Sequence, residues 1–230
     1  MRISYISALL FIMLSPAITQ ASGIQIGRTR VIYDADKKEV PLAISNKDNE
    51  RPWLIQSWTD TGDGKTRGPF IITPPLFRLD PQKEQNLRIT WSGAKLPENR
   101  ESLFYINVRS IPATAKADKD QNTLRLIYKT RLKLFWRPKG LEGGPTANCR
   151  DLQFSREGSQ LRVINNGAYY SVFDSLHIGT TALKNIDFVA PKSTITLPLP
   201  NGATGSTLTW HCISDYGNAT AAFTTSLAGK

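Results

Sequence analysis

The feature that most constrains the fold is an alternating segment, residues 124–138, which ends at a proline. In its first half the alternate residues Leu124, Leu126 and Tyr128 are apolar. Its second half contains arginine and lysine residues within an otherwise apolar run. Successive side chains of a β-strand point to opposite faces, so a period of two predicts a strand with two unlike faces. A second strand-like segment, 99–112, also ends at a proline.

The N-terminus has the pattern of an export signal. A positive start at Met1-Arg2 precedes an apolar stretch over residues 6–18, and Thr19-Gln20-Ala21 forms a small-x-small cleavage site. This pattern predicts a secretory signal peptide over residues 1–21; a buried N-terminal helix is the alternative. No later segment approaches ~20 uninterrupted apolar residues, so we expect an exported protein with no membrane insertion after cleavage.

The remainder is predicted to be all-β, because short β-branched and aromatic runs are separated by Gly, Pro and Asn. The glycine-rich segment 140–145 divides it into two units, residues 22–142 and 143–230. Seven short strands in each suggest two consecutive β-sandwiches of immunoglobulin type. The expected strands are 31–33, 39–46, 53–59, 70–73, 86–91, 103–111 and 123–136, then 152–155, 161–165, 169–178, 186–189, 194–197, 207–213 and 220–226.

The positive charge is concentrated in the first unit. Residues 22–142 contain 22 Lys/Arg against 14 Asp/Glu, whereas residues 143–230 contain 6 against 5. A sequence pI near 9.7 would ordinarily suggest a nucleic-acid partner. The export signal and the lack of an aromatic-basic motif argue against nucleic acid, and we expect instead an extracytoplasmic protein partner with an exposed carboxylate.

The two cysteines, Cys149 and Cys212, both lie in the second unit. An even number of cysteines in an oxidising compartment favours a disulfide between them. A metal site with His177 and His211 is the alternative. The metal site is disfavoured for two reasons. Neither cysteine has a nearby ligand at C-x-x-C spacing, and the adjacent residues His211 and Cys212 would point to opposite faces of a strand.

No catalytic arrangement stands out. His211 and Asp215 could be imagined beside a serine, but the chain contains no G-x-S-x-G nucleophile motif. Nothing selects one pair of carboxylates over another. We therefore expect a protein that is not an enzyme and that needs no cofactor and no metal.

Several segments together resemble the periplasmic pilus chaperones, the immunoglobulin-like members of the chaperone–usher family. One segment departs from that family: an Asn-Pro-x-Pro-Tyr-Tyr turn is replaced by Asn-Asn-Gly-Ala-Tyr-Tyr at 165–170. The F–G connection, roughly 113–122, is short and lacks cysteine, which resembles the short-loop branch. The segments that carry the resemblance are 27–34 (GRTRVIYD), 42–46 (LAISN), 73–79 (TPPLFRL), 100–105 (RESLFY), 133–138 (KLFWRP), 169–170 (YY) and 214–217 (SDYG).

The resemblance implies two immunoglobulin-like sandwiches in an L-shaped arrangement, located in the periplasm. It implies a chaperone that folds and caps pilus subunits, including pilins and tip adhesins, and delivers them to an outer-membrane usher. The alternatives are a pilus subunit or adhesin, which would also be exported and immunoglobulin-like, and an exported enzyme.

In that family the last strand of the first sandwich is lent to the client subunit. By position, the donor side chains are expected to be Leu124, Leu126 and Tyr128, unless these residues only pack within the protein's own sheet. Ile127, which has the opposite parity, is the expected contributor to the chaperone's own core.

The resemblance also implies two charged groups of residues. Arg30 and Lys133 match the cations that hold the client's terminal carboxylate in the cleft between the sandwiches. Glu101, Arg137 and Asp215 match an ion network that sets the angle between the two sandwiches.

Overall fold

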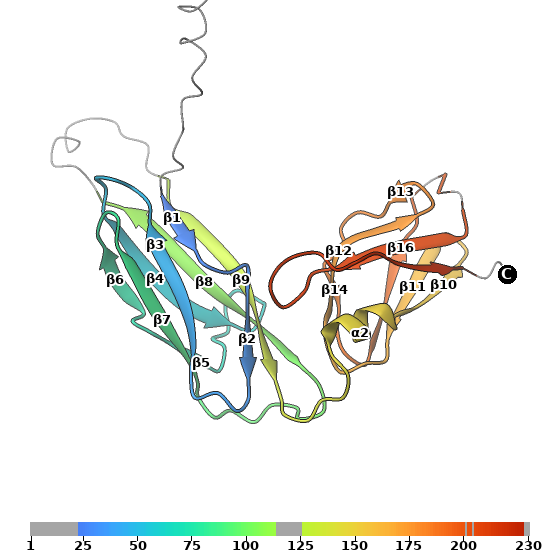
Figure 1. Cartoon of the computed structure of the whole chain (residues 1–230), viewed down its shortest axis with the longest axis horizontal. Helices are drawn as coiled ribbons and strands as arrows, with labels where there is room; N and C mark the ends of the chain where they lie inside the picture. Colours follow the sequence, from blue (N-terminus) through green and yellow to red (C-terminus); the bar gives the residue numbers. More distant parts are fainter. Residues whose placement is uncertain (1–22, 114–125, 201, 204, 228–230) are drawn as a thin grey trace, which may run out of the picture.

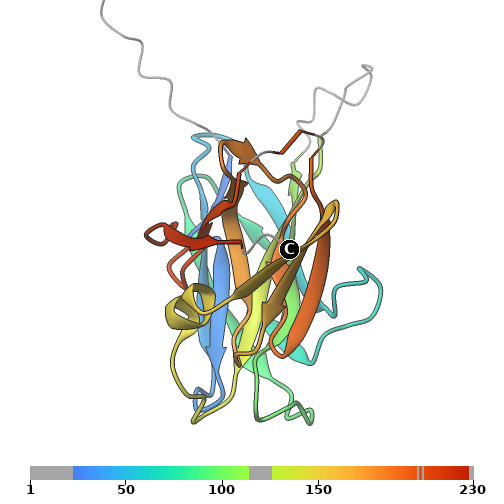
Figure 2. The same ribbon diagram turned by 90° about the vertical axis from the view of Figure 1, so that its right-hand side faces the viewer.

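The computed structural model describes residues 23–113, 126–200, 202–203 and 205–227. In these ranges the chain forms two β-sandwiches that meet at an angle (Figure 1). Figure 2 turns the molecule so that the second sandwich lies in front of the first. The prediction of an all-β chain with two sandwiches is confirmed.

The first sandwich consists of a four-stranded and a five-stranded sheet. Alternate residues of each strand point into one core, as in β4, where Trp53 and Ile55 are buried and Leu54 is not. The smaller sheet has the order β1 (Ile24–Ile26), β3 (Val40–Asn46), β7 (Glu84–Trp91), β5 (Phe70–Thr73), and the larger has β2 (Arg30–Asp34), β9 (Tyr128–Arg137), β8 (Ser102–Pro112), β4 (Trp53–Asp60), β6 (Leu76–Leu79).

Strand β9 determines where the functional residues lie. It pairs in antiparallel fashion with β8 and in parallel with β2, so it occupies an interior position in its sheet. Its even-numbered residues Leu132, Leu134 and Trp136 are buried in the first core. Its odd-numbered residues therefore project from the opposite face, which is the face toward the second sandwich (Figure 1).

The second sandwich is smaller and has its own core around Leu161, Phe173 and Trp210. The seven predicted strands of this sandwich are confirmed within a few residues at each end, and a two-residue strand, Thr181–Ala182, was not predicted. One sheet has the order β10 (Gln153–Glu157), β11 (Gln160–Asn165), β15 (Ser193–Pro198), and the other has β13 (Thr181–Ala182), β12 (Ser171–Ile178), β16 (Thr207–Cys212), β17 (Phe223–Ser226), with β14 (Phe188–Val189) paired to β12.

A short helix, α2 (Pro145–Arg150), opens the second sandwich and was not predicted. Proline at the first helical position is favourable because its missing N–H would have no partner there. The helix places Cys149 against the end of β16, where it forms the predicted disulfide with Cys212. The indole N–H of Trp210 donates to the carbonyl of Cys149 at 3.0 Å, which further ties the helix to the core.

The turn that departs from the family pattern is organised by Asn148 of α2. Its side-chain nitrogen donates to the Asn165 side-chain oxygen and to the Tyr169 carbonyl, and its oxygen accepts from the Tyr169 N–H. A Cβ atom at Gly167 would overlap the Asn148 side chain, so only glycine fits there. A buried asparagine and a glycine thus shape this turn without the family's prolines.

The disulfide leads to a first prediction. A Cys149→Ser/Cys212→Ser double variant should lower the free energy of unfolding of the second sandwich by about 4 kcal/mol, because the link closes a long loop of the unfolded chain. The measurement is urea unfolding followed through the amide NMR signals of β12 and β16. Signals of β3 and β7 in the first sandwich serve as the internal control and should keep their midpoint. Two reactive thiols in the unfolded, unreduced wild type would contradict the link itself.

Candidate functional site

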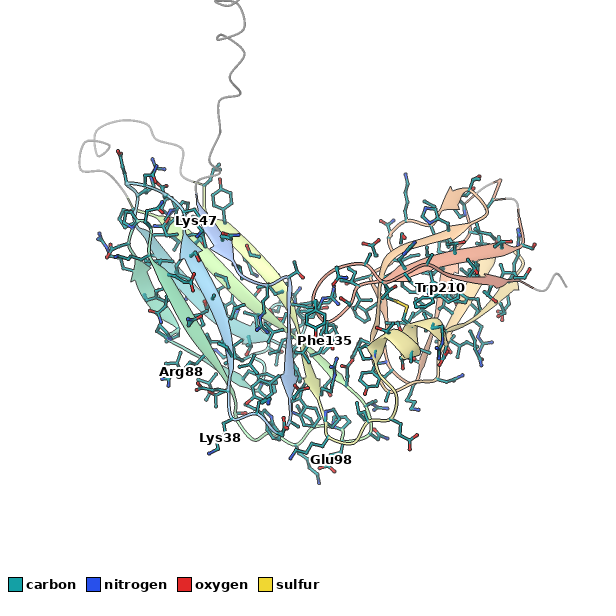
Figure 3. The ribbon with its side chains drawn as sticks, viewed as in Figure 1. Lys38, Lys47, Arg88, Glu98, Phe135 and Trp210 are labelled. Atoms are coloured by element: carbon teal, nitrogen blue, oxygen red, sulfur yellow. A yellow bond between two sulfur atoms is a disulfide. The ribbon has the colours of Figure 1, made fainter. Side chains whose placement is uncertain are left out.

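The outward face of β9 meets the second sandwich through an aromatic contact. Phe135 is only 3% exposed although it points away from its own core. Its ring lies 5.5 Å from the ring of Tyr170, which in turn lies 5.4 Å from Phe188. Figure 3 shows Phe135 between the two sandwiches. We refer to the surroundings of Phe135 as the interdomain junction.

The predicted cation pair is assembled at this junction. Arg30 of β2 and Lys133 of β9 are direct partners in the parallel ladder. Neighbouring strands are about 4.8 Å apart, and partners in register project from the same face. The two cations, which are far apart in the sequence, are therefore neighbours on the face that meets the second sandwich.

Arg30 is buried, with 8% of its surface exposed. One terminal nitrogen donates to the Ile213 carbonyl of the second sandwich at 3.2 Å, whereas Nε has no partner among the described residues. Burial lowers the pKa of Arg30, and the charges of Asp215 and Asp187 counteract this. Arginine nonetheless stays protonated at neutral pH. The junction thus contains a buried cation with unused hydrogen-bonding capacity.

Lys133 is paired with a carboxylate that sequence reasoning missed. Its Nζ lies 2.6 Å from Oδ1 of Asp187 and 6.0 Å from the centroid of the Phe188 ring. Asp187 immediately precedes β14 in the second sandwich. No periodicity or motif distinguishes this aspartate from other loop acids, so only the folded chain shows its position.

The three residues of the predicted ion network are also brought together. Arg137 Nε donates to Glu101 Oε1 at 2.8 Å, and its two terminal nitrogens donate to Asp215 at 2.7 and 2.9 Å. The other Glu101 oxygen accepts from the Tyr170 N–H at 2.8 Å. One arginine therefore joins a carboxylate of its own sandwich to a carboxylate of the other.

Burial makes the charges of this network interdependent. Desolvation raises the pKa of the Glu101 carboxyl, and Arg137 and the Tyr170 N–H counteract that rise. Desolvation alone would lower the pKa of Arg137, but its bonds to Asp215 and Glu101 outweigh burial and the pKa is raised. Removing one member of such a network leaves a buried charge without compensation.

The described part of the expected donor segment extends beyond the core. Leu126 and Tyr128 are 56% and 54% exposed, and Leu124 lies outside the described residues. Tyr128 has the same parity as the buried Leu132, and its ring is 6.2 Å from Trp53 at the end of the core. Beyond the exposed Thr130, residues of the inward parity therefore form an exposed apolar strip, with Tyr128 at the start of β9 and Leu126 just before the strand.

The expectation that Ile127 belongs to the chaperone's own core is wrong, because this side chain is 58% exposed. The pairing of β8 with β9 ends at Ser110 and Tyr128, so among the residues that the structure describes no strand pairs with Ile127. Its odd parity also matches the outward face of β9 rather than the inward one. Of the expected strand 123–136, residues 123–125 lie outside the described ranges and the strand begins at Tyr128.

Two sandwiches joined by a cationic junction, with an apolar strand end beyond the first core, are the features that the resemblance to pilus chaperones led us to expect. The family described as "Pili and flagellar-assembly chaperone, PapD N-terminal domain" matches residues 23–142, and "Pili assembly chaperone PapD, C-terminal domain" matches residues 147–224. The chain belongs to this family of periplasmic pilus chaperones.

Individual relatives agree with the family assignment. The chain is 40% identical over 213 residues to the chaperone protein FimC of Escherichia coli K12, covering 92% of this chain and 88% of FimC. It is 37% identical over 219 residues to the probable fimbrial chaperone LpfB of Escherichia coli O157:H7, covering 95% of this chain and 94% of LpfB.

Solved structures of similar proteins also agree with the family assignment. The chaperone SafB of Salmonella enterica, in complex with the pilin SafA, matches with a TM-score of 0.82 and 29% identity, covering 91% of this chain and 98% of SafB. The Escherichia coli chaperone DraB matches with a TM-score of 0.80 and 33% identity, over 90% and 98% of the two chains. These relatives are chaperones rather than enzymes, pilus subunits or adhesins. Within the described residues, no helix is both long and apolar enough to span a membrane.

The ion network leads to a second prediction. Arg137→Ala should lower the free energy of unfolding of the first sandwich by about 3–5 kcal/mol, because the buried Glu101 loses its cation. Urea unfolding can be followed by tryptophan fluorescence, since four of the five tryptophans lie in the first sandwich.

The matched control is Arg78→Ala, which is also in the first sandwich. Arg78 also pairs with a carboxylate, Asp80, at 2.7 Å, but the two side chains are 68% and 56% exposed. Exposed pairs contribute at most about 1 kcal/mol, so this variant should be nearly neutral. Equal losses for the two arginine variants would show that burial of the network does not matter.

Proposed function

We propose that this chain is exported through a signal peptide at residues 1–21 and acts in the periplasm as two units, residues 22–142 and 143–230. There it binds pilus subunits, folds and caps them, and delivers them to an outer-membrane usher. The family assignment supports this proposal, as does the complex of the related SafB with the pilin SafA. The short F–G connection in the sequence, roughly residues 113–122 with no cysteine, supports membership of the short-loop branch of the family.

The observation that carries the proposal is the exposed apolar strip formed by Tyr128, the first residue of β9, and Leu126 just before the strand. Leu126 and Tyr128 share the parity of core residues, yet more than half of each side chain is exposed. An apolar strand end of this kind would ordinarily promote aggregation. A subunit that lacks its own last strand offers a groove in which such a strand can be buried, a form of β-augmentation.

Leu124, Leu126 and Tyr128 are the proposed donor side chains. Main-chain hydrogen bonds to the subunit supply attraction that is insensitive to register, while alternate apolar side chains fill pockets of the groove. A slip of one residue would turn the apolar side chains to the wrong face. Donor-strand binding therefore needs a second contact that fixes the register.

The pair Arg30 and Lys133 is the proposed register contact, which binds the terminal carboxylate of the subunit. Lys133 lies on β9 together with Tyr128, so the distance between these two residues along the strand is fixed, and Leu126 and Leu124 precede the strand directly in the sequence. Hydrogen bonds between ionised groups are stronger than neutral ones, and burial of Arg30 strengthens them further. Glu101, Arg137 and Asp215 hold the second sandwich in position beside this carboxylate site.

The carboxylate site leads to a third prediction. Lys133→Ala or Arg30→Ala should reduce subunit binding by more than tenfold, because loss of one partner of a buried charged contact costs about 2–5 kcal/mol. Pilus subunits that co-purify from a periplasmic extract can be quantified by mass spectrometry. Lys38→Ala, which removes an exposed lysine away from the junction (Figure 3), is the control and should bind normally. Wild-type recovery of subunits with either junction variant would rule out this role for the pair.

The donor strip leads to a fourth prediction. Leu126→Glu should abolish subunit capture, because its carboxylate would enter an apolar pocket without a partner. Ile127→Glu is the matched control, since Ile127 is equally exposed in the free chain but has the opposite parity. Its effect should be mild. If both substitutions reduce capture equally while the protein stays folded, the assignment of the donor face by parity fails.

A further inference from the structure

The proposed carboxylate site already contains a carboxylate of the chain itself. Asp187 of the second sandwich lies 2.6 Å from Lys133 Nζ, and its charge also acts on the buried Arg30. A terminal carboxylate that reaches Lys133 must therefore approach Asp187 as well. Two like charges in such proximity repel each other, and they do so more strongly in a partly desolvated cleft than in bulk water.

Asp187 is held in a way that allows its side chain to leave. Its backbone carbonyl accepts from the Phe173 N–H at 2.9 Å, which fixes the main chain beside β12. The side chain is 58% exposed, and among the described residues Lys133 is its one hydrogen-bonding partner. Rotation of the side chain into water would break a single ion pair and leave the main chain in place.

Asp215, the other acid near Arg30, is held differently. Its two oxygens accept from both terminal nitrogens of Arg137, and its side chain is 31% exposed. Two parallel charged hydrogen bonds resist displacement more strongly than one contact to a lysine. Of the two acids, Asp187 is thus the one that can exchange with an arriving carboxylate.

We propose that Asp187 is a placeholder for the client's terminal carboxylate: it neutralises Lys133, yields to the client on binding, and takes Lys133 back on release. This inference rests on the proposed function of the Arg30–Lys133 pair. The exchange leaves one carboxylate at Lys133 before and after binding. Because the client must displace Asp187 from Lys133, the exchange lowers client affinity and accelerates release. A protein that transfers its client to another protein requires such release.

The test uses a small carboxylate instead of a subunit. N-Acetylglycine carries a terminal carboxylate, and N-acetylglycinamide is its neutral counterpart. Binding to the full chain is measured by the NMR shifts of the Arg30 and Lys133 amides during titration. Asp187→Asn should lower the dissociation constant of N-acetylglycine roughly threefold to tenfold, because one ion pair and one repulsion are removed. It should leave the response to N-acetylglycinamide unchanged.

Two control variants separate the placeholder role from a general charge effect. Asp174→Asn removes the same charge from an exposed position of β12 and should change the dissociation constant by less than about twofold. Asp187→Glu retains a carboxylate and should stay close to the wild type. If Asp174→Asn lowered the dissociation constant of N-acetylglycine as much as Asp187→Asn does, the proposal would be overturned.

The remaining outcomes distinguish this inference from the proposed function. If the wild type binds N-acetylglycine at Arg30 and Lys133 but Asp187→Asn binds it equally or more weakly, the placeholder is refuted and the carboxylate site stands. If neither protein shows a response of these two amides to N-acetylglycine, the carboxylate site itself is refuted, and the placeholder with it.

Discussion

The alternation of side chains along β9 is the constraint on which the rest of the structure depends. Its inward residues Leu132 and Leu134 complete the first core, and its outward residues Lys133 and Arg137 form the charged junction. A shift of one residue against β8 would exchange the two faces, burying the cations and exposing the core. The register that builds the fold is therefore the same register that positions the candidate site.

The junction combines an aromatic contact with a buried ion network, and the two have different physical roles. Burial of Phe135 against Tyr170 is attractive but weakly directional. The contacts of the Arg137 guanidinium are directional, because it donates hydrogen bonds to the carboxylates of Glu101 and Asp215 in a fixed geometry. Replacing such a network by apolar residues often costs no stability, so we propose that its role here is to orient the two sandwiches.

Local patterns in the sequence predicted much of this structure, and long-range contacts limited the rest. Alternation predicted β8 and β9, but it could not show where their pairing ends, and for that reason Ile127 was misassigned. Helix α2 is too short to show a helical period. Arg30 and Lys133 could be associated only through the family resemblance, because their adjacency depends on a parallel pairing of distant segments. Asp187 carried no signal, since its role depends on the placement of an entire second sandwich.

The parallel pairing of β2 with β9 also determines the order in which the site can be assembled. β2 is among the first strands of the chain and β9 is the last strand of the first sandwich. Arg30 therefore meets Lys133 only after all the intervening strands have been synthesised. The acids near the pair, Asp187 and Asp215, come later still in the chain. The proposed carboxylate site thus requires both ends of the first sandwich, so a chain that stops before β9 has no such site with which to bind a client.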